Sequence, residues 1–476
     1  MELKMIYNIN MAKRILSALC VLFIVSLFSC GGDPEPTPPP PPPPPVVAGN
    51  TITVNPADLK QEMVGFGGAL TWYCNWVTNN NKKQEIADLM FDDLGIDIIR
   101  FKNWYYPGNY PTNKSTADMP DVDNDYAKSH WDATNELYDL AMARNPNIKI
   151  LLSSWGPPTV LKSNSKLQEG TLKKDGSGYM YDEFADYWVD VLDNVPFDPD
   201  YISIQNEPTF STSGWTTCKW EINETASLAG YNTAFNKVYD KIKDRTHVPV
   251  MLGPESQDVS TFVSFANVLK DNPNCPMYAF HPYNINSGTA ASTVTSSLKS
   301  VGNFTKPNMM TEFSDNLTDW YSNALFIHKT LVDANSSGYI YWKLSWSTPA
   351  SGEDAAMISV GSGAATPYKV TPYYHLIKHF SKHIDAGHHR VAATSSNGSI
   401  FTSAFISPDN SKLTLVIIND KTTAESVKIN VTGKTATAIN VFQSKTGSFY
   451  KTVTVSSPAD AVSLPSKSIT TVVLDI

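Results

Sequence analysis

Residues 201–210 read Tyr-Ile-Ser-Ile-Gln-Asn-Glu-Pro-Thr-Phe. Ile202 and Ile204 flank a small serine, a pattern that predicts a short buried strand. The strand must end at Pro208, because proline has no backbone N–H to donate to a neighbouring strand. Glu207 is therefore expected at the carboxyl end of a strand, the end at which α/β sheets and barrels bind ligands. The alternative is a glutamate that only begins a loop.

A second short apolar run, Asn-Met-Met-Thr-Glu-Phe-Ser at residues 308–314, also ends in a glutamate, Glu312. Roughly 100 residues separate it from Glu207, and a (β/α)8 barrel uses roughly 30 to 40 residues for each strand and helix. Glu207 would then end strand four and Glu312 strand seven, so that both carboxylates face one mouth of the barrel. Two facing carboxylates are what glycoside hydrolysis needs, one to protonate the leaving oxygen and one to attack or assist at the anomeric carbon.

The order of the remaining runs predicts the fold class, an α/β (β/α)8 TIM barrel over residues 61–386. Eight strand-like runs alternate with connecting segments, several of which space their apolar residues as helices do. The strands are expected near residues 64–71, 96–101, 148–154, 201–205, 248–256, 277–283, 308–312 and 338–343. Helices are expected at residues 82–93, 131–143, 184–192, 226–243 and 375–383.

Residues 387–476 have a different composition, rich in Ser, Thr and Val. Short alternating runs separated by turn residues predict a small antiparallel β-sandwich side domain. Residues 49–60 begin with Asn-Thr-Ile-Thr-Val and are expected to give this sandwich an outlying strand, packed against the barrel. The clearest strand predictions in the side domain are residues 400–405, 413–418, 426–431 and 470–474.

The amino terminus resembles a bacterial lipoprotein leader. A basic pair precedes an apolar run of about fourteen residues that is too short to span a membrane comfortably, so residues 1–29 are expected to be a signal peptide. The run ends in Leu-Phe-Ser-Cys-Gly, which resembles a lipobox and implies lipidation of Cys30. Residues 30–48 form a proline-rich linker. The segment looks like that of a Bacteroidetes-type outer-membrane lipoprotein at the cell surface, held to the membrane by lipid alone; the alternative is a secreted protein with an incidental cysteine.

The composition of the chain indicates which classes of partner to expect. The net charge is −9 and no basic run occurs beyond the extreme amino terminus, so no nucleic-acid partner is expected. The chain has 11 Trp and 22 Tyr, which favours carbohydrate binding, although rings also fill cores. Cys74, Cys218 and Cys275 are too few and too widely spaced for a disulfide framework or a zinc site. One disulfide bridge remains open, and its pairing does not follow from the sequence.

Four short motifs occur at the ends of predicted strands: Gln-Asn-Glu-Pro at 205–208, Gly-Pro-Glu-Ser at 253–256, His-Pro-Tyr at 281–283 and Thr-Glu-Phe-Ser at 311–314. Together with the barrel-plus-sandwich order, they resemble glycoside hydrolase family 30. The resemblance extends from residue 50 to the end, and residues 205–210 followed by 214–220 look most like its xylanase branch. It implies that Glu207 is the general acid/base and Glu312 the nucleophile of a retaining double displacement.

Further residues receive roles in substrate binding. Asn206, beside the acid, can hydrogen-bond a sugar 2-hydroxyl. Arg100, near the end of strand two, can keep Glu312 ionised, and Tyr283 can hold it in one rotamer. The resemblance also implies that four residues line the sugar subsites: Trp155, His281, Tyr283 and Trp342.

Two of these residues have alternatives. His281 is expected to orient a neighbour rather than to bind metal, because no second histidine stands at ligand spacing. Trp342 is expected to be a sugar platform, with core packing as the alternative. No metal or other cofactor is implied.

One departure from the family pattern bears on the substrate. Members that require glucuronic acid side chains carry an arginine just after strand eight, whereas residues 343–348 read Lys-Leu-Ser-Trp-Ser-Thr. The expected reaction is therefore endo-cleavage of β-1,4-xylan without strict dependence on glucuronic acid. Alternatives within the family are β-1,6-glucanase, β-1,6-galactanase and glucosylceramidase-like activities. An alternative of another class is a non-catalytic surface lipoprotein that binds glycans.

Overall fold

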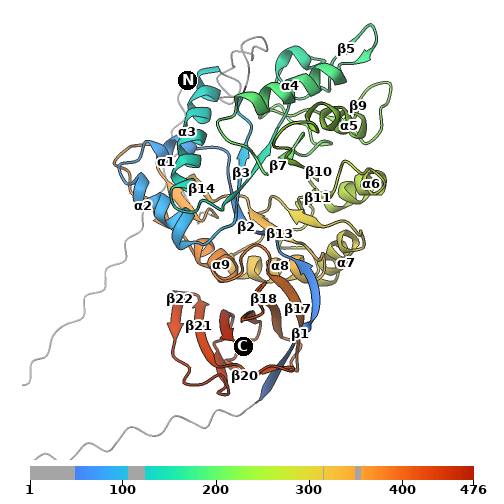
Figure 1. Cartoon of the computed structure of the whole chain (residues 1–476). Coiled ribbons are helices and arrows are strands. Elements are labelled where there is room, and N and C mark those ends of the chain that lie inside the picture. The colour runs from blue at the N-terminus through green and yellow to red at the C-terminus, as the bar shows by residue number, and fades with distance from the viewer. Residues whose placement is uncertain (1–48, 106–123, 315, 349–354) are drawn as a thin grey trace, which may run out of the picture. The chain divides into compact units, whose positions relative to one another are not determined.

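The computed structural model describes residues 49–105, 124–314, 316–348 and 355–476 (Figure 1). The predicted signal peptide, Cys30 and the proline-rich linker lie outside the described residues. Within the described ranges, no helix has both the length and the apolar character needed to cross a membrane. Cys74, Cys218 and Cys275 are all buried as free thiols.

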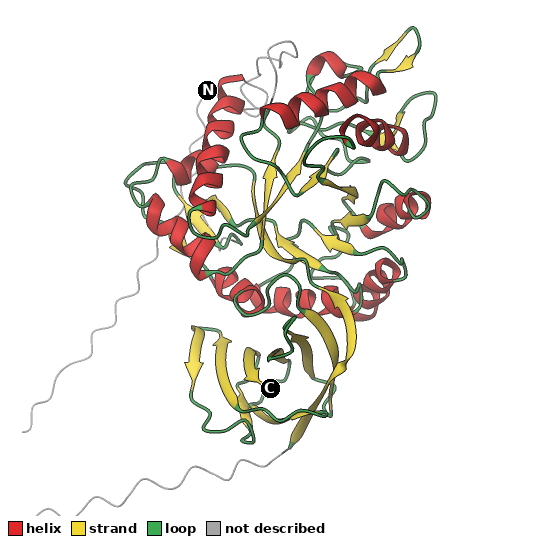
Figure 2. Ribbon diagram, viewed as in Figure 1, coloured by secondary structure: helices red, strands yellow, loops and turns green. Residues whose placement is uncertain are grey.

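Eight parallel strands close into a barrel, which confirms the predicted (β/α)8 fold (Figure 2). The strands follow one another around the barrel in chain order, and β13 pairs with β2 to close it. β2 is rich in glycine because its neighbours lie very close: a Cβ added to Gly67 would lie 2.2 Å from the carbonyl oxygen of Ile98. The strands are β2 (Gly65–Leu70), β3 (Ile98–Lys102), β4 (Lys149–Ser153), β7 (Tyr201–Ser203), β10 (Val250–Ser256), β11 (Met277–Phe280), β12 (Asn308–Met310) and β13 (Gly338–Tyr341).

Helices surround the barrel in Figure 2. Apolar side chains on their inner faces pack against the outer faces of the strands in one large core. The helical elements are α1 (Cys74–Thr78), α2 (Lys83–Asp88), η1 (Leu89–Asp93), α3 (Asn124–Met142), η3 (Thr159–Leu161), α4 (Tyr181–Asn194), α5 (Tyr231–Ile242), α6 (Val259–Leu269), α7 (Ala291–Gly302), α8 (Trp320–Val332) and α9 (Pro372–Ser381).

The predicted helices differ in their bounds from the observed ones, and two of them also differ in local structure. The helix expected at 82–93 is α2 followed by one π-helical turn, η1. The helix expected at 226–243 begins only at Tyr231, because Ala229 and Gly230 pair with Trp220 and Glu221 as a two-stranded ribbon. Short strands of this kind outside the barrel and the main sheet are β5 (Lys174–Asp175), β6 (Gly178–Tyr179), β8 (Trp220–Glu221), β9 (Ala229–Gly230), β14 (Ser345–Ser347), β15 (Ile358–Val360) and β16 (Lys369–Val370).

The interior of the barrel is filled with small and medium-sized apolar side chains. They form a cluster of their own inside the ring of strands, so the barrel is a packed core and not a pore. Polar side chains concentrate instead where the strands end. The buried interior residues are Ala69, Ile98, Leu151, Leu252, Met277, Ala279, Met309 and Ile340.

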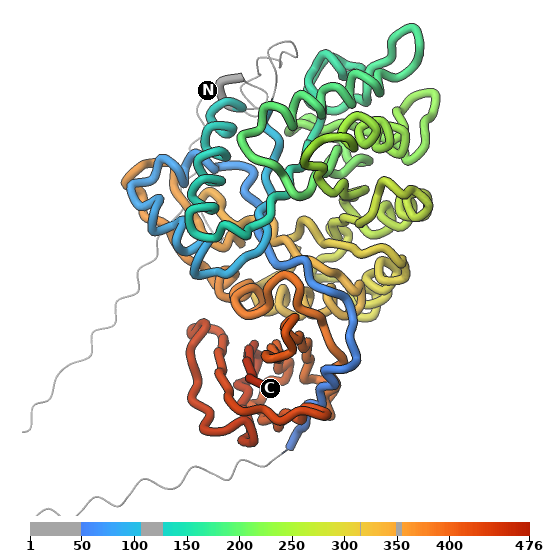
Figure 3. Tube along the Cα trace, viewed as in Figure 1, coloured from blue at the N-terminus to red at the C-terminus, as the bar shows by residue number. Residues whose placement is uncertain are grey.

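The carboxy-terminal strands form one hydrogen-bonded sheet of nine strands in the order β22-β21-β24-β19-β18-β17-β1-β20-β23. The amino-terminal strand β1 lies between β17 and β20, and Figure 3 shows this segment, in blue, beside the orange and red strands. β1 is antiparallel to β17 but parallel to β20, so the predicted sandwich is not purely antiparallel. The strands are β1 (Asn50–Glu62), β17 (His389–Ser395), β18 (Ile400–Ile406), β19 (Lys412–Asn419), β20 (Glu425–Val431), β21 (Ala438–Lys445), β22 (Ser448–Val453), β23 (Val462–Leu464) and β24 (Ser468–Asp475).

The sheet packs on the barrel through helix α9. The imidazole of His379 is fully buried, with Nδ1 2.8 Å from Thr471 Oγ1 and Nε2 2.8 Å from Ser444 Oγ. One turn to either side, histidine rings stack on the phenylalanines of β21 and β22. Burial lowers the pKa of His379 well below its usual value, so this contact is built from a neutral imidazole.

Candidate active site

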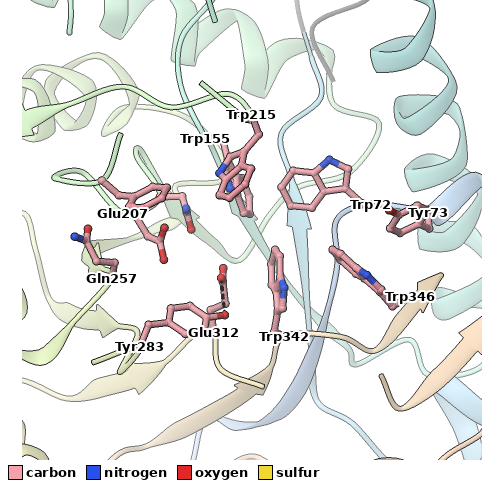
Figure 4. A pocket seen from close by; sticks show the side chains of 13 residues that line it. Trp72, Tyr73, Trp155, Glu207, Trp215, Gln257, Tyr283, Glu312, Trp342 and Trp346 are labelled. Atoms are coloured by element: carbon pink, nitrogen blue, oxygen red, sulfur yellow. Dashed lines mark hydrogen bonds between the residues drawn. The ribbon is translucent and has the colours of Figure 1, made fainter. Parts of the chain in front are cut away.

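A cavity of about 540 Å³ opens at the carboxyl ends of the barrel strands. Eight of its thirteen lining residues are aromatic, and two are the glutamates that the sequence singled out. Figure 4 shows Trp72, Trp342 and Trp346 on one side of the two carboxylates and Gln257 on the other. The lining residues are Trp72, Tyr73, Trp155, Asn206, Glu207, Phe210, Gly214, Trp215, Gln257, Tyr283, Glu312, Trp342 and Trp346.

The carboxylates of Glu207 and Glu312 face one another. One oxygen of each, together with a ring nitrogen of His281, lies within 4.8 Å of the other two. Glu207 follows β7 with a left-handed φ of 46°, and its N–H donates to the backbone oxygen of Glu255 at 2.9 Å. The backbone of the loop is therefore fixed against the end of β10.

Glu312 is held by two donors at the floor of the cavity. Arg100 Nη1 donates to one carboxylate oxygen at 2.7 Å, and the hydroxyl of Tyr283 donates to the other at 2.9 Å. Burial raises the pKa of Glu312 and the facing Glu207 adds to the rise, whereas His281, Arg100 and Tyr283 act against it. These donors favour the ionised carboxylate in one fixed orientation.

Arg100 connects several acceptors with one guanidinium group. Besides Glu312, it donates from Nη2 to the side-chain oxygen of Asn206 at 2.6 Å and from Nε to Glu255 at 2.8 Å. Its side chain is fully buried beneath the ring of Trp155, 4.7 Å from the ring centroid. Arg100 does not line the cavity: it donates to Glu312, the residue that it was predicted to keep ionised, and it orients Asn206, which does line the cavity.

Glu255 is a third carboxylate to which the sequence analysis gave no role. It ends β10, is fully buried, and accepts hydrogen bonds from Arg100 and from Ser153 Oγ at 3.2 Å. Burial alone would raise the pKa of Glu255, but Arg100 and His281 outweigh burial and hold the pKa at about 2. Its place at the end of a barrel strand is the signal by which the sequence could have revealed it.

His281 lies among all three carboxylates. Its Nδ1 is 3.1 Å from Glu207 and 4.0 Å from Glu312, and its Nε2 is 3.8 Å from Glu255. Burial lowers the pKa of His281, but Glu312, Glu207 and Glu255 outweigh burial and raise the pKa to about 9.

The ring is fully buried, so His281 does not line a sugar subsite as predicted; the crowding of negative charge draws it beneath the acids. Glu207, His281 and Glu312 are near enough together to hold a cation. A protonated imidazole has no lone pair for a metal, and Arg100 already places a positive charge at Glu312.

The predicted aromatic residues Trp155, Tyr283 and Trp342 all line the cavity, as does Asn206. The sequence analysis missed Trp72, whose ring meets Trp155 edge to face at 5.5 Å between centroids. Further rings that line the cavity and were not predicted to do so are Tyr73, Phe210, Trp215 and Trp346. Trp72 follows β2 by two residues. The expectation that residues at the carboxyl ends of barrel strands face the ligand, which singled out Glu207, therefore applies to Trp72 as well.

No family model matches the sequence. The chain is 27% identical over 194 residues to an endo-1,6-β-D-glucanase of Aspergillus fumigatus, a match that covers 36% of this chain and 40% of that protein. The chain thus matches about two fifths of the length of this curated relative.

Solved structures match over nearly the whole length. A glycoside hydrolase family 30 subfamily 8 xylanase from Clostridium acetobutylicum is 20% identical with a TM-score of 0.65, covering 90% of this chain and 100% of that one. An endo-β-1,6-glucanase is 18% identical with a TM-score of 0.68, covering 90% and 95%. The chain therefore shares the barrel-and-sheet fold of glycoside hydrolase family 30 structures.

Proposed function

We propose that this protein is a retaining glycoside hydrolase that cleaves a β-linked polysaccharide. The observation that carries the proposal is the pair of glutamate oxygens within 4.8 Å of each other at the floor of an aromatic cavity. Retaining enzymes place their two carboxyl groups about 5 to 5.5 Å apart, whereas inverting enzymes leave about 6.5 to 9.5 Å for a water molecule. The separation here fits the retaining mechanism.

In the first step, Glu312 attacks the anomeric carbon of the bound sugar. The glycosidic C–O bond breaks, and Glu207 transfers its proton to the leaving oxygen. A covalent ester between Glu312 and the sugar results, and the leaving part of the glycan departs with the proton. Asn206, oriented by Arg100, is placed to hydrogen-bond the sugar 2-hydroxyl.

In the second step, water replaces the leaving glycan. Glu207, now a carboxylate, takes one proton from this water as the water oxygen bonds to the anomeric carbon. The ester bond to Glu312 breaks and restores the free carboxylate. Glu207 is again protonated, so each residue ends the cycle in its starting state.

The buried charges suit this cycle. Three carboxylates face two cations, Arg100 and the protonated His281, so one further proton makes the cluster neutral. Glu312 has Arg100 and Tyr283 as hydrogen-bond donors, and Glu207 is the acid nearest to solvent. These surroundings suit Glu312 to the role of the nucleophile and Glu207 to that of the general acid.

The xylan backbone is the first substrate we propose. The support is the resemblance of residues 205–210 and 214–220 to the xylanase branch, and the absence of an arginine from residues 343–348 argues against a strict requirement for glucuronic acid. The second candidate is β-1,6-glucan, which is favoured by the similarity in sequence to an endo-1,6-β-D-glucanase. Both reactions would use the same two glutamates.

Reducing-end release from xylan, arabinoxylan, β-1,6-glucan and β-1,6-galactan tests the proposal. The α or β configuration of the first product, followed by NMR, tests the retaining mechanism separately. Release from xylan supports the first substrate, and release from β-1,6-glucan alone supports the second. Binding without release from any of the four glycans would favour the non-catalytic alternative.

We also propose that the protein is exported and anchored by a lipid on Cys30. The support is the apolar run followed by Leu-Phe-Ser-Cys-Gly and the proline-rich segment. Metabolic labelling with a palmitate analogue in a Bacteroidetes host should label the wild-type protein but not the Cys30→Ser variant. Release of the wild-type protein into the medium without label would contradict the anchor.

A further inference from the structure

Trp215 is the one tryptophan among the described residues that leaves a large part of its ring exposed, at 41% of its surface. The ring lines the cavity and stacks on Phe210 with 5.9 Å between centroids and 21° between planes. Aromatic faces of this kind bind the C–H faces of sugars, while burial in the core is the usual fate of an indole. The position of Trp215 at the cavity calls for a ligand.

The loop that carries Trp215 is fastened at its base. The fully buried ammonium of Lys162 donates to the backbone oxygens of Glu169 and Thr217, and to that of Leu167 at 3.3 Å. Thr217 Oγ1 in turn accepts from the N–H of Glu169 at 2.9 Å. These bonds tie the loop to its neighbour two residues after Trp215, so the exposed ring stands on an ordered support.

The loop that carries Trp215 lies on the same side of the cavity as Glu207. The N–H of Phe210 donates to the backbone oxygen of Glu207 at 2.9 Å, so both stacked rings are on the same loop as the proposed acid. Thr209, which lies between Glu207 and Phe210 in sequence, donates from its hydroxyl to the side-chain oxygen of Gln257 at 2.9 Å. Figure 4 places Glu207 between Glu312 and Gln257, with Trp72 beyond Glu312.

We propose that Trp215 and Phe210 form a stacking platform for the first sugar unit on the leaving side of the scissile bond. This inference rests on the proposed function, because a general acid protonates the leaving oxygen and the leaving sugar must therefore lie on the side of Glu207. Gln257 would hydrogen-bond the hydroxyls of that unit. A platform there lets the enzyme hold a glycan on both sides of the cut, as endo-acting enzymes do.

The test uses xylohexaose and a β-1,6-linked glucohexaose, each labelled at the reducing end. In Trp215→Ala, we expect the KM for the cleaved oligosaccharide to rise by about tenfold or more while kcat changes little, and the cut to move along the chain. Trp215→Phe keeps an aromatic face and should restore most of the affinity. Leu59→Ala, also an exposed apolar residue but on β1, serves as the control and should behave like the wild type.

Affinity is measured in parallel in the Glu312→Gln background, with and without Trp215→Ala. Cleavage by the wild type with the same KM and cut site in Trp215→Ala would refute the platform and leave the proposed hydrolase standing. Loss of oligosaccharide affinity in the double variant, together with a wild type that cleaves neither probe, would refute the hydrolase and with it the leaving-side assignment, and would leave Trp215 as a glycan contact only. Equal affinity of both Glu312→Gln proteins would again refute the platform.

Discussion

Arg100 Nη1 lies 2.7 Å from Glu312 Oε2, and the same guanidinium group donates to Glu255 from Nε. Both carboxylates are almost completely shielded from water, so each relies on this arginine, together with His281, for compensation of its charge. Removal of a partner from a buried ion pair costs about 3 to 5 kcal/mol, because an uncompensated charge remains.

Arg100→Met should therefore lower the free energy of unfolding by about that amount. It should also abolish glycan hydrolysis, because Glu312 loses a donor that keeps it ionised. Urea denaturation and an activity assay check both expectations. Arg100→Lys is the matched control. It keeps the positive charge but loses the planar guanidinium group that donates to Glu312, Glu255 and Asn206 together. A Met variant as stable as the wild type would contradict the assigned role.

The roles of the two glutamates can be separated by chemical rescue. Glu312→Ala and Glu207→Ala should each lower kcat by about a thousandfold or more on glycans with poor leaving groups. On aryl glycosides, whose good leaving groups depart without a proton, azide as a small nucleophile should restore activity to both variants. It should give an α-glycosyl azide when it replaces Glu312 and a β-glycosyl azide when it attacks the glycosyl-enzyme of the Glu207 variant. The same anomer from both variants, read by NMR, would exclude the double displacement.

The charge of His281 predicts an alkaline limit. Its pKa is about 9 in the folded protein against 6.5 in the unfolded chain, so the folded state binds more protons between these values. Stability from this group is complete below pH 6.5 and is lost as the pH rises through about 9, by an amount on the order of 3 kcal/mol. The melting temperature of the wild type should fall across this range, whereas that of His281→Asn should be flatter. Parallel curves would exclude a buried imidazolium.

Glu255 should be the residue that supports this imidazolium from below. Glu255→Gln keeps an oxygen for Arg100 but removes a negative charge 3.8 Å from His281 Nε2. The titration of His281, followed by NMR of its ring, should then move to lower pH by about one unit or more. The Ser153→Ala variant removes a hydrogen bond to Glu255 without changing charge and should move it little. An unchanged titration in Glu255→Gln would assign the imidazolium to Glu207 and Glu312 alone.

The contact between α9 and the sheet predicts an acid limit of a different origin. His379 has a folded-state pKa well below 6.5, so the unfolded chain binds the proton more readily. Its contribution to stability is complete above pH 6.5 and decreases as the pH falls below that value. His379→Gln can still bond Thr471 and Ser444 but does not titrate, and it should lose less stability between pH 6.5 and 4. Equal losses, measured by urea denaturation, would place the acid sensitivity elsewhere.

The sequence predicted those parts of the site that lie on strands. Glu207 and Glu312 each follow an apolar run that only a buried strand explains, and barrel topology brings the ends of such runs together. Trp215 was missed because it belongs to a loop, whose path depends on distant contacts such as the one between Lys162 and Thr217. The prediction that His281 lines a sugar subsite was wrong, because the ring is buried among three carboxylates that come from different strands. No local sequence pattern shows that these carboxylates meet around it.

The sheet domain was predicted less completely for a related reason. Alternation identifies a strand but not its partners, so the parallel pairing of β1 with β20 could not be derived from either segment alone. In the barrel, by contrast, the order of strands follows the order of the chain, and neighbours in sequence become neighbours in space.

Because β1 precedes the barrel and its two partners follow it, the ribosome makes this strand long before anything exists for it to pair with. Throughout synthesis of the barrel, a strand with both edges open must be kept from pairing with other chains. Closure of the sheet is therefore a late event that reports a finished polypeptide. A chain interrupted before β17 would expose the unpaired strand β1 at its amino terminus. Cellular quality control could recognise the incomplete chain by this exposed strand.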